Sequence, residues 1–240
     1  MPCTAEEASS SVQFFYRGKP MKILQPDLSG TRIRLEKEEA YAYLLRHKKE
    51  EEDVTGVHFV GLFLDEESFG AMTFKECVFE SCRMMECKLE GGSWIKNEWI
   101  ACDLSGSRMS EGYFHRNRFR DCKMMGTDLC QGNFQEMILE ECNLGYSNWD
   151  QGRFKNLLYR ACDCERTFFS DGRMKNVYWE ECRLAGVNFF RTPLRGMDFT
   201  KCELGPVTVS DTFAELRGAK VTAMQALSLS RLLGIEIASE

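Results

Sequence analysis

In this chain a large apolar residue recurs at every fifth position over most of its length. From Phe69 to Leu204 this series contains 28 consecutive positions, and none of them holds a polar residue. We call this place in the five-residue repeat position i. The residue two places before it, position i−2, is mostly small. The pattern predicts that positions i and i−2 point inward, whereas i−1, i+1 and i+2 face water.

The charged residues follow the same period. Residues 67–206 contain 19 Lys and Arg and 21 Asp and Glu, and of these 40 only Glu67 stands at i or i−2. Random placement would put about two-fifths of the charges at two positions out of five, and buried unpaired charges are costly. The interior is therefore predicted to be apolar along the whole repeat region.

A step of five residues fits neither regular secondary structure. Five residues of α-helix rotate by about 500°, which would spread position i around the helix. In a flat strand an odd step moves the side chain to the opposite face. The chain must therefore turn a corner about every five residues, which predicts a solenoid.

The number of corners in each coil follows from a second period, of twenty residues. Cysteine or glycine recurs at this spacing at i−2, as in Cys82 to Cys202 and Gly92 to Gly172. Four repeats therefore form one square coil, and seven coils form a rod of roughly 34 Å at the usual strand spacing. At one corner Asn97 and Asn117 give way to larger apolar residues, which should widen or distort that wall. These residues are Met137, Leu157, Val177 and Met197.

The predicted core consists of aromatic rings at position i and thiols at position i−2. Fifteen of the 28 residues at position i are aromatic, and stacked rings contribute beyond their burial. The core residues are Phe74, Phe79, Trp94, Trp99, Phe114, Phe119, Phe134, Trp149, Phe154, Trp179, Cys82, Cys102, Cys122, Cys142, Cys162, Cys182 and Cys202.

These repeats resemble those of the pentapeptide-repeat family. Segments such as ESCRMMECKLEG and RDCKMMGTDLCQGNF show the consensus of a small residue, a polar one, Leu or Phe, and two more polar residues. The resemblance covers about residues 57–211. It implies an all-β fold: a right-handed, quadrilateral parallel β-helix with a C-terminal capping helix.

The same patterns divide the chain into three parts. We expect an extension and cap segment over residues 1–53, the β-helix over 54–211 and a C-terminal capping or dimerisation helix over 212–240. Residues 1–20 look irregular, and the segment MKILQPDLSG from Met21 looks like the usual start of related proteins. Residues 36–53 read as a charged helix or an extended acidic segment, from which Tyr41, Leu44 and Leu45 could contact the first coil.

The C-terminal segment carries helix signals and a broad apolar surface. Thr222 and Gln225 match a capping box, and Gly234 fits a helix stop. This segment could seal the last coil or also join two subunits. It resembles the C-terminal module of quinolone-resistance-type pentapeptide proteins, which implies a homodimer. The candidate interface residues are Met224, Leu227, Leu229, Leu232 and Leu233.

Candidate chemistry is sparse. The cysteine column is interpreted as a buried thiol ladder rather than a metal site, because zinc needs four convergent ligands. Cys130, at an outward position, is the better candidate for a reactive thiol. His47, His58 and His115 are scattered over separate segments or faces. We therefore predict no enzyme activity, no metal and no cofactor.

Net charge and termini narrow the class of protein. With 31 Lys and Arg against 37 Asp and Glu, the formal charge is −6, which argues against direct nucleic-acid or membrane binding. No apolar stretch approaches the length of a membrane span, and the N-terminus has no basic leader. The expected location is the cytoplasm, with the cysteines reduced.

Two sides of the predicted coil carry opposite charge. The side with Trp94, Phe114 and Phe154, here the basic side, sums to +6, and the next side, with Trp99 and Phe119, here the acidic side, sums to −4. The candidate interaction face on the acidic side is Glu98, Asp121, Glu140, Glu141, Glu180, Glu181 and Asp198. Such charges are either a solvated surface with ion pairs between coils or a docking face.

Two functions remain open. The first is a protein-interaction solenoid whose partner is not identified by the sequence. The second follows from the resemblance: a DNA-mimic-like modulator of DNA gyrase or topoisomerase IV that protects against fluoroquinolones. A B-DNA segment of about 34 Å carries on the order of 20 phosphate charges, far more than this surface offers. The charge pattern therefore favours the first function.

Overall fold

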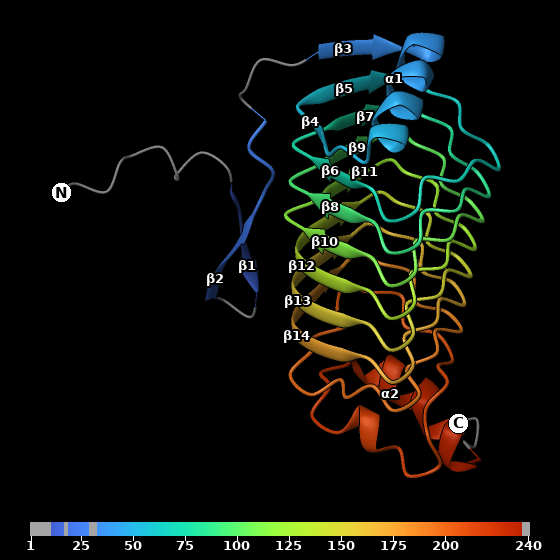
Figure 1. The fold of residues 1–240 in the computed structure, drawn as a ribbon. Helices are drawn as coiled ribbons and strands as arrows, with labels where there is room; N and C mark the ends of the chain where they lie inside the picture. Colours follow the sequence, from blue (N-terminus) through green and yellow to red (C-terminus); the bar gives the residue numbers. More distant parts are fainter. Residues whose placement is uncertain (1–10, 17–18, 29–32, 237–240) are drawn as a thin grey trace.

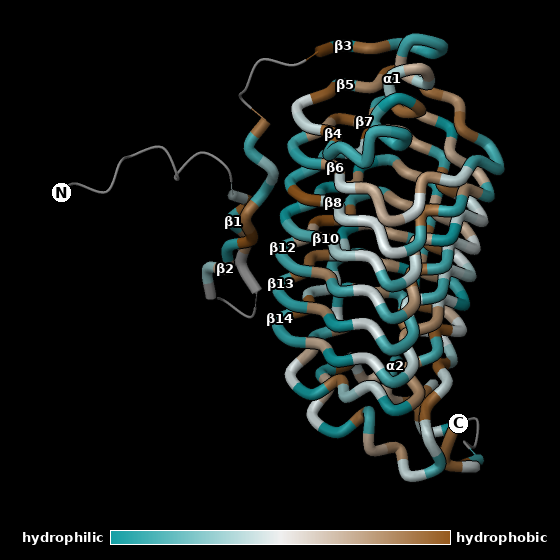
Figure 2. Tube along the Cα trace, viewed as in Figure 1, coloured by the Kyte–Doolittle hydropathy of each residue, from teal (hydrophilic) through white to brown (hydrophobic). Residues whose placement is uncertain are grey.

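The computed structural model describes residues 11–16, 19–28 and 33–236. In this part of the chain a single solenoid of square coils runs from an N-terminal helix to a C-terminal one (Figure 1). The fold class is confirmed: a right-handed parallel β-helix of about seven coils. Residues of like hydropathy stack over one another from coil to coil (Figure 2).

The strands occupy two of the four sides and pair in parallel, β3 with β5 at a step of 24 residues and the later strands at a step of twenty. Phe79 pairs with Trp99, and Trp99 with Phe119, as the twenty-residue period predicts. The remaining two sides are joined by isolated bridges at a spacing of twenty residues, except for Asp198 with Lys220 at the last coil. The strands of the solenoid are β3 Ile33–Glu36, β4 Val54–Thr55, β5 Val57–Val60, β6 Thr73–Lys75, β7 Val78–Glu80, β8 Ser93–Ile95, β9 Glu98–Ile100, β10 Tyr113–His115, β11 Arg118–Arg120, β12 Asn133–Glu140, β13 Arg153–Arg160 and β14 Arg173–Glu180.

The corners are formed at position i+2, where the backbone adopts a left-handed conformation. Lys96 and Asp121, for example, both have φ of 55°. The corner N–H then points along the axis to the next coil, as from Lys96 N to the carbonyl oxygen of His115 at 2.7 Å. Non-glycine residues tolerate this conformation at a modest cost, which the bonds between coils offset.

All seventeen residues predicted for the core are buried, none of them more than 8% exposed. The rings form stacks along the axis. Phe74 and Trp94 lie 4.5 Å apart between ring centroids with an interplanar angle of 3°, and Tyr159 and Trp179 lie 4.3 Å apart at 8°. The register places one ring directly over the next, so burial and stacking reinforce each other.

One corner changes along the rod, at the i−2 positions noted in the sequence. In the first coils Asn97 accepts a hydrogen bond from Cys77 N at 2.9 Å and donates one to the Phe74 carbonyl oxygen at 3.0 Å. From Met137 onwards the backbone pairs directly across the corner, with Met137 opposite Leu157. As a result β12, β13 and β14 each run for eight residues through a corner that separates β10 from β11.

The N-terminal region differs from the expectation of irregular structure. Strands β1, Ser11–Tyr16, and β2, Lys19–Leu24, form an antiparallel hairpin beside the lower coils (Figure 1). The prediction that residues 1–20 are irregular is therefore wrong for β1 and for the first two residues of β2; residues 1–10 and 17–18 lie outside the described residues. The hairpin forms because its apolar residues cover an apolar column on the outside of the β-helix.

The first coil is capped by helix α1, Lys37–Glu50. Of the two alternatives for this segment, the charged helix is confirmed. Leu44 is buried, and Tyr41 donates a hydrogen bond to Glu67 Oε1 at 2.9 Å. Leu45, expected to contact the coil, is 42% exposed, because it lies on the outer face of the helix.

The last coil is closed by the short helices η2, Ala214–Leu216, α2, Ala223–Ser230, and η3, Arg231–Leu233. The capping box is confirmed: Gln225 N donates to Thr222 Oγ1 at 3.2 Å and Thr222 N to Gln225 Oε1 at 2.8 Å. Gln225 Nε2 also donates to the carbonyl oxygens of Phe199 and Cys202 at 2.9 and 2.8 Å. The side chain of Gln225 therefore caps the start of α2 and also provides hydrogen-bond donors for two backbone carbonyl oxygens at the open end of the last coil.

Candidate interaction surfaces

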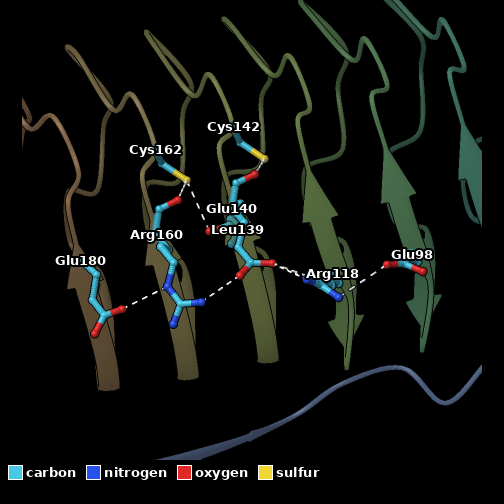
Figure 3. Close-up of polar contacts among 8 residues, drawn as sticks. All are labelled: Glu98, Arg118, Leu139, Glu140, Cys142, Arg160, Cys162 and Glu180. Atoms are coloured by element: carbon cyan, nitrogen blue, oxygen red, sulfur yellow. Dashed lines mark hydrogen bonds and ion pairs between the residues drawn. The ribbon is translucent and has the colours of Figure 1, made fainter. Parts of the chain in front are cut away.

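The acidic side is crossed by a ladder of alternating charges on successive coils (Figure 3). Arg118 lies 3.8 Å from Glu98 and 2.7 Å from Glu140. Arg160 lies 3.0 Å from Glu140 and 3.1 Å from Glu180. The three glutamates are only 13–18% exposed. Three of the seven candidate acidic residues are thus paired with arginines within the molecule, in agreement with the alternative of a surface with ion pairs between coils.

The other candidate acidic residues have different surroundings. Asp121, Glu141 and Glu181 are exposed at corners, in one row along the rod. Asp198 lies 2.7 Å from Lys220 and is 12% exposed. Burial alone would raise the pKa of Asp198, but hydrogen bonds from Lys220 and Thr200 outweigh it and lower this pKa. The predicted face is therefore not one continuous negative surface.

The hairpin covers a column of outward residues on the acidic side, and the sequence analysis did not predict this contact. Ile138, Leu158 and Tyr178 stand at the outward position i−1 on successive coils, yet they are no more than 5% exposed. Phe14 and Ile23 of the hairpin pack on them, with the ring centroids of Phe14 and Tyr178 5.1 Å apart. Three apolar residues in an outward column were the signal that could have predicted this cover.

A hydrogen bond at the neighbouring corner also holds the hairpin. Leu24 N donates to Glu136 Oε2 at 3.0 Å, and Glu136 Oε1 accepts from the side chain of Asn156. Both oxygens of the Glu136 carboxylate are therefore engaged within the molecule.

The basic side changes along the rod. In the upper coils Lys75 lies 2.5 Å from Asp53, and Lys96 lies 2.8 Å from Glu76. In the lower coils the cations are exposed, and among the described residues no ion pair involves them. These cations are Arg153, Lys155, Arg173, Lys175 and Arg195.

The thiols lie mainly in the interior of the coils. All eleven cysteines of the described residues are free, and all but Cys130 are buried. Several donate to backbone carbonyl oxygens, as Cys102 does to Phe79 O at 3.2 Å. Within this part of the chain no group of three or more His, Cys, Asp or Glu side chains could hold a metal ion.

Cys130 does not have the surroundings of a reactive thiol. Burial, followed by the carboxylates of Asp128, Asp150 and Glu111, raises the pKa of Cys130 to about 11. Because the thiolate is the reactive species, nearly all of this thiol is unreactive at neutral pH. The raised pKa therefore argues against Cys130 as a reactive thiol; the sequence showed its outward position but not its acidic neighbours.

The C-terminal end presents apolar side chains to solvent. Met224 is 71%, Leu227 41% and Leu233 57% exposed, whereas Leu229 and Leu232 pack partly against the core. The five candidate interface residues therefore divide into an exposed group and a group that supports the cap.

A buried carboxylate lies beside an open hollow of about 540 Å³ at this end. Glu215 is 4% exposed and accepts hydrogen bonds from Arg191 N at 2.8 Å and from Ser210 N at 3.1 Å. Burial alone would raise the pKa of Glu215, but these donors outweigh it and hold this pKa below its usual range. The carboxylate ties the last turn to the coil.

No helix among the described residues has the length and apolar character to cross a bilayer.

Comparisons with known proteins support the architecture. Residues 93–169 match the family described as pentapeptide repeat region. HetL, a pentapeptide repeat protein involved in heterocyst differentiation regulation in the cyanobacterium Nostoc, superposes with a TM-score of 0.61 at 13% identity, over 75% of this chain and 90% of HetL. Trypsin-treated QnrB1, a plasmid-mediated fluoroquinolone resistance protein, gives 0.47 at 17% identity over 86% of this chain and 97% of QnrB1. No curated protein matches the sequence. At these identities the likeness to HetL establishes the fold alone.

Proposed function

Because this chain belongs to the pentapeptide-repeat family, we propose that it acts without catalysis, as a rigid protein-interaction solenoid in the cytoplasm. The observation that supports this proposal is the outward surface of the coils. Inward positions are filled by stacked rings, whereas outward side chains stand in rows fixed by the register between coils. A surface that is already ordered binds a partner with little loss of conformational entropy.

The test compares which proteins are captured by the full chain and by variants with an altered surface, each used as bait. The full chain and variants altered on one side at a time are immobilised, and captured proteins are identified and then purified. We expect a partner that forms a saturable, stoichiometric complex and is lost with changes on one side only. If no purified candidate binds saturably, or if every variant retains every partner, the proposal is wrong.

We also propose that the C-terminal end joins two copies of this chain. Support comes from the exposed side chains of Met224, Leu227 and Leu233 beside a sealed coil. Leu227→Glu with Leu233→Glu should convert a dimer to a monomer in light scattering, with an unchanged circular dichroism spectrum. Leu232→Glu is a less specific test, because Leu232 also packs on the core. A monomeric parent protein, or a variant that keeps the parent mass, would refute the interface.

Modulation of DNA gyrase or topoisomerase IV is the second candidate. The row of Asp121, Glu141 and Glu181 supports it, because these carboxylates are exposed along the rod axis. The support is limited, since Glu98, Glu140 and Glu180 are neutralised by arginines. A supercoiling assay with purified gyrase, with and without a fluoroquinolone, tests whether this chain modulates the enzyme. Neither inhibition nor protection at micromolar protein would exclude this candidate, and a variant with all three carboxylates as amides should lose any effect.

A further inference from the structure

Five cations on the basic side form a compact patch on three successive coils. Arg153 pairs in register with Arg173, and Lys155 pairs with Lys175. Arg195 stands at the equivalent place one coil further on, twenty residues after Lys175. All five side chains are exposed. We call these five residues the cationic patch.

The cationic patch differs from the ion-pair ladders on other sides of the rod. In those ladders the register brings opposite charges together, as in Figure 3 and in Arg183, which lies 2.8 Å from Asp163. In the patch it places like charges one coil apart, about 4.8 Å in a parallel sheet, where they repel. Within the described residues no carboxylate forms an ion pair with any of the five.

We propose that the cationic patch binds an acidic segment of a partner polypeptide, an inference that rests on the proposed protein-interaction function. Arg153 and Lys155 lie two residues apart on one strand, a separation of about 6.6 Å. Carboxylates at alternate positions of an extended segment have the same separation. The three coils span about 10 Å across the strands, enough for a few carboxylates. Arginine and lysine both form charge-assisted hydrogen bonds with such groups.

The surroundings favour a short acidic segment over a nucleic acid. The ring of Phe154 beneath the patch is 2% exposed, so a base has no ring to stack on within it. The neighbouring corner carries Glu136, and the chain as a whole has a formal charge of −6. A long polyanion that extended beyond the patch would meet these negative charges, whereas a short segment would not.

The test uses a short fluorescent peptide of alternating glutamate and serine as the probe. Its affinity for the full chain is measured by anisotropy at low and at physiological salt. The patch variant combines Arg173→Glu with Lys175→Glu. The control variant combines Lys88→Glu with Lys123→Glu, two exposed lysines on the other sides, and therefore changes the net charge equally. Circular dichroism checks that both fold, and Arg173→Gln with Lys175→Gln provides a milder pair.

We expect the patch variant to bind at least about 10-fold more weakly than the parent, the glutamine pair to bind with an intermediate affinity, and the control to change by less than about 2-fold. Binding should weaken as salt rises. No binding to the parent, or an equal loss in both glutamate variants, would overturn the proposal. Tighter binding of an oligothymidylate than of the peptide would assign the patch to nucleic acid instead, which also overturns it.

The patch and the proposed function can fail separately. If a purified partner binds saturably to the patch variant as it does to the parent, the patch inference is wrong and the interaction function stands. If no partner binds the parent at all but the peptide does, the function is wrong and the patch remains an anion-binding surface.

Discussion

The corner between the basic and acidic sides is built in two ways along the rod. In the upper coils the side-chain amides of Asn97 and Asn117 complete the hydrogen bonding at the corner. In the lower coils Met137, Leu157 and Val177 fill the corner, and the backbone of one coil pairs directly with that of the next. The same fold therefore satisfies buried backbone groups either through a side chain or through a longer strand.

The two regions also differ on their outer surface. The upper coils have compensated charges, as in Lys96 with Glu76. The lower coils carry an apolar column under the hairpin on one side and the cationic patch on the other. The comparison shows that the repeat determines the interior everywhere, while each group of coils has its own exterior.

The largest expected effect comes from removing the amide at the upper corner. Asn97→Leu leaves Cys77 N and the Phe74 carbonyl oxygen buried without their partner. We expect the free energy of unfolding to fall by about 3 kcal/mol, since each unsatisfied buried group costs about 1–3 kcal/mol. Urea denaturation measures it. Lys123→Ala, at an exposed site, is the control and should change stability by less than about 0.5 kcal/mol.

The next effect concerns the hairpin on the lower coils. Phe14→Ala removes the ring that packs on Tyr178. The free energy that holds the hairpin on the β-helix should fall by about 2 kcal/mol, which is less than the loss expected for a Phe enclosed on all sides. Amide hydrogen exchange should become fast in β1 and β2 and stay slow in β12 to β14. Gln13→Ala, on the exposed face of β1, should leave exchange unchanged. Equal loss of protection in the β-helix would mean that the hairpin is part of the main cooperative unit.

A smaller effect is expected from the ion-pair ladder. Arg160→Met leaves Glu140 and Glu180 without their shared cation. The expected loss is about 1 kcal/mol at low salt, because the pairs are partly exposed, and it should shrink as salt rises. Thermal unfolding at two ionic strengths checks this. A loss that does not depend on salt would indicate that Arg160 contributes by packing instead.

The smallest effect is a change in pH dependence at the C-terminal end. The pKa of Glu215 and that of Asp198 are both lowered in the fold. A carboxylate with a lowered pKa stabilises the fold above its unfolded pKa and ceases to do so as pH falls through its folded pKa. Stability should therefore be level above the ordinary glutamate value of 4.5 and fall below it. Glu215→Gln should flatten this decline; an unchanged acid profile would contradict the assignment.

Much of the fold could be predicted because the repeat is local and regular. The five-residue period identifies inward positions such as Trp99 and Cys122, and the twenty-residue period gives their partners in the next coil. Position i must be large and apolar to fill a square coil, and each coil repeats that condition. The capping box at Thr222 was equally local and therefore readable.

The surface could be predicted much less well. The sequence showed the charges of Glu98, Glu140 and Glu180 but not their pairing with Arg118 and Arg160, which depends on rotamers across coils. It showed Cys130 as outward but not the carboxylates around it. A charge count treats each residue as independent, whereas the net charge that a partner encounters depends on which side chains form ion pairs with one another.

The sequence by itself thus determined the interior of this protein: the coil, its period and the residues stacked within it. Only the tertiary structure decided that β1 and β2 fold back onto Ile138, Leu158 and Tyr178, more than a hundred positions away. The physical reason is that burial in the coils follows from spacing along the chain, whereas contacts on the outside join segments that no period connects.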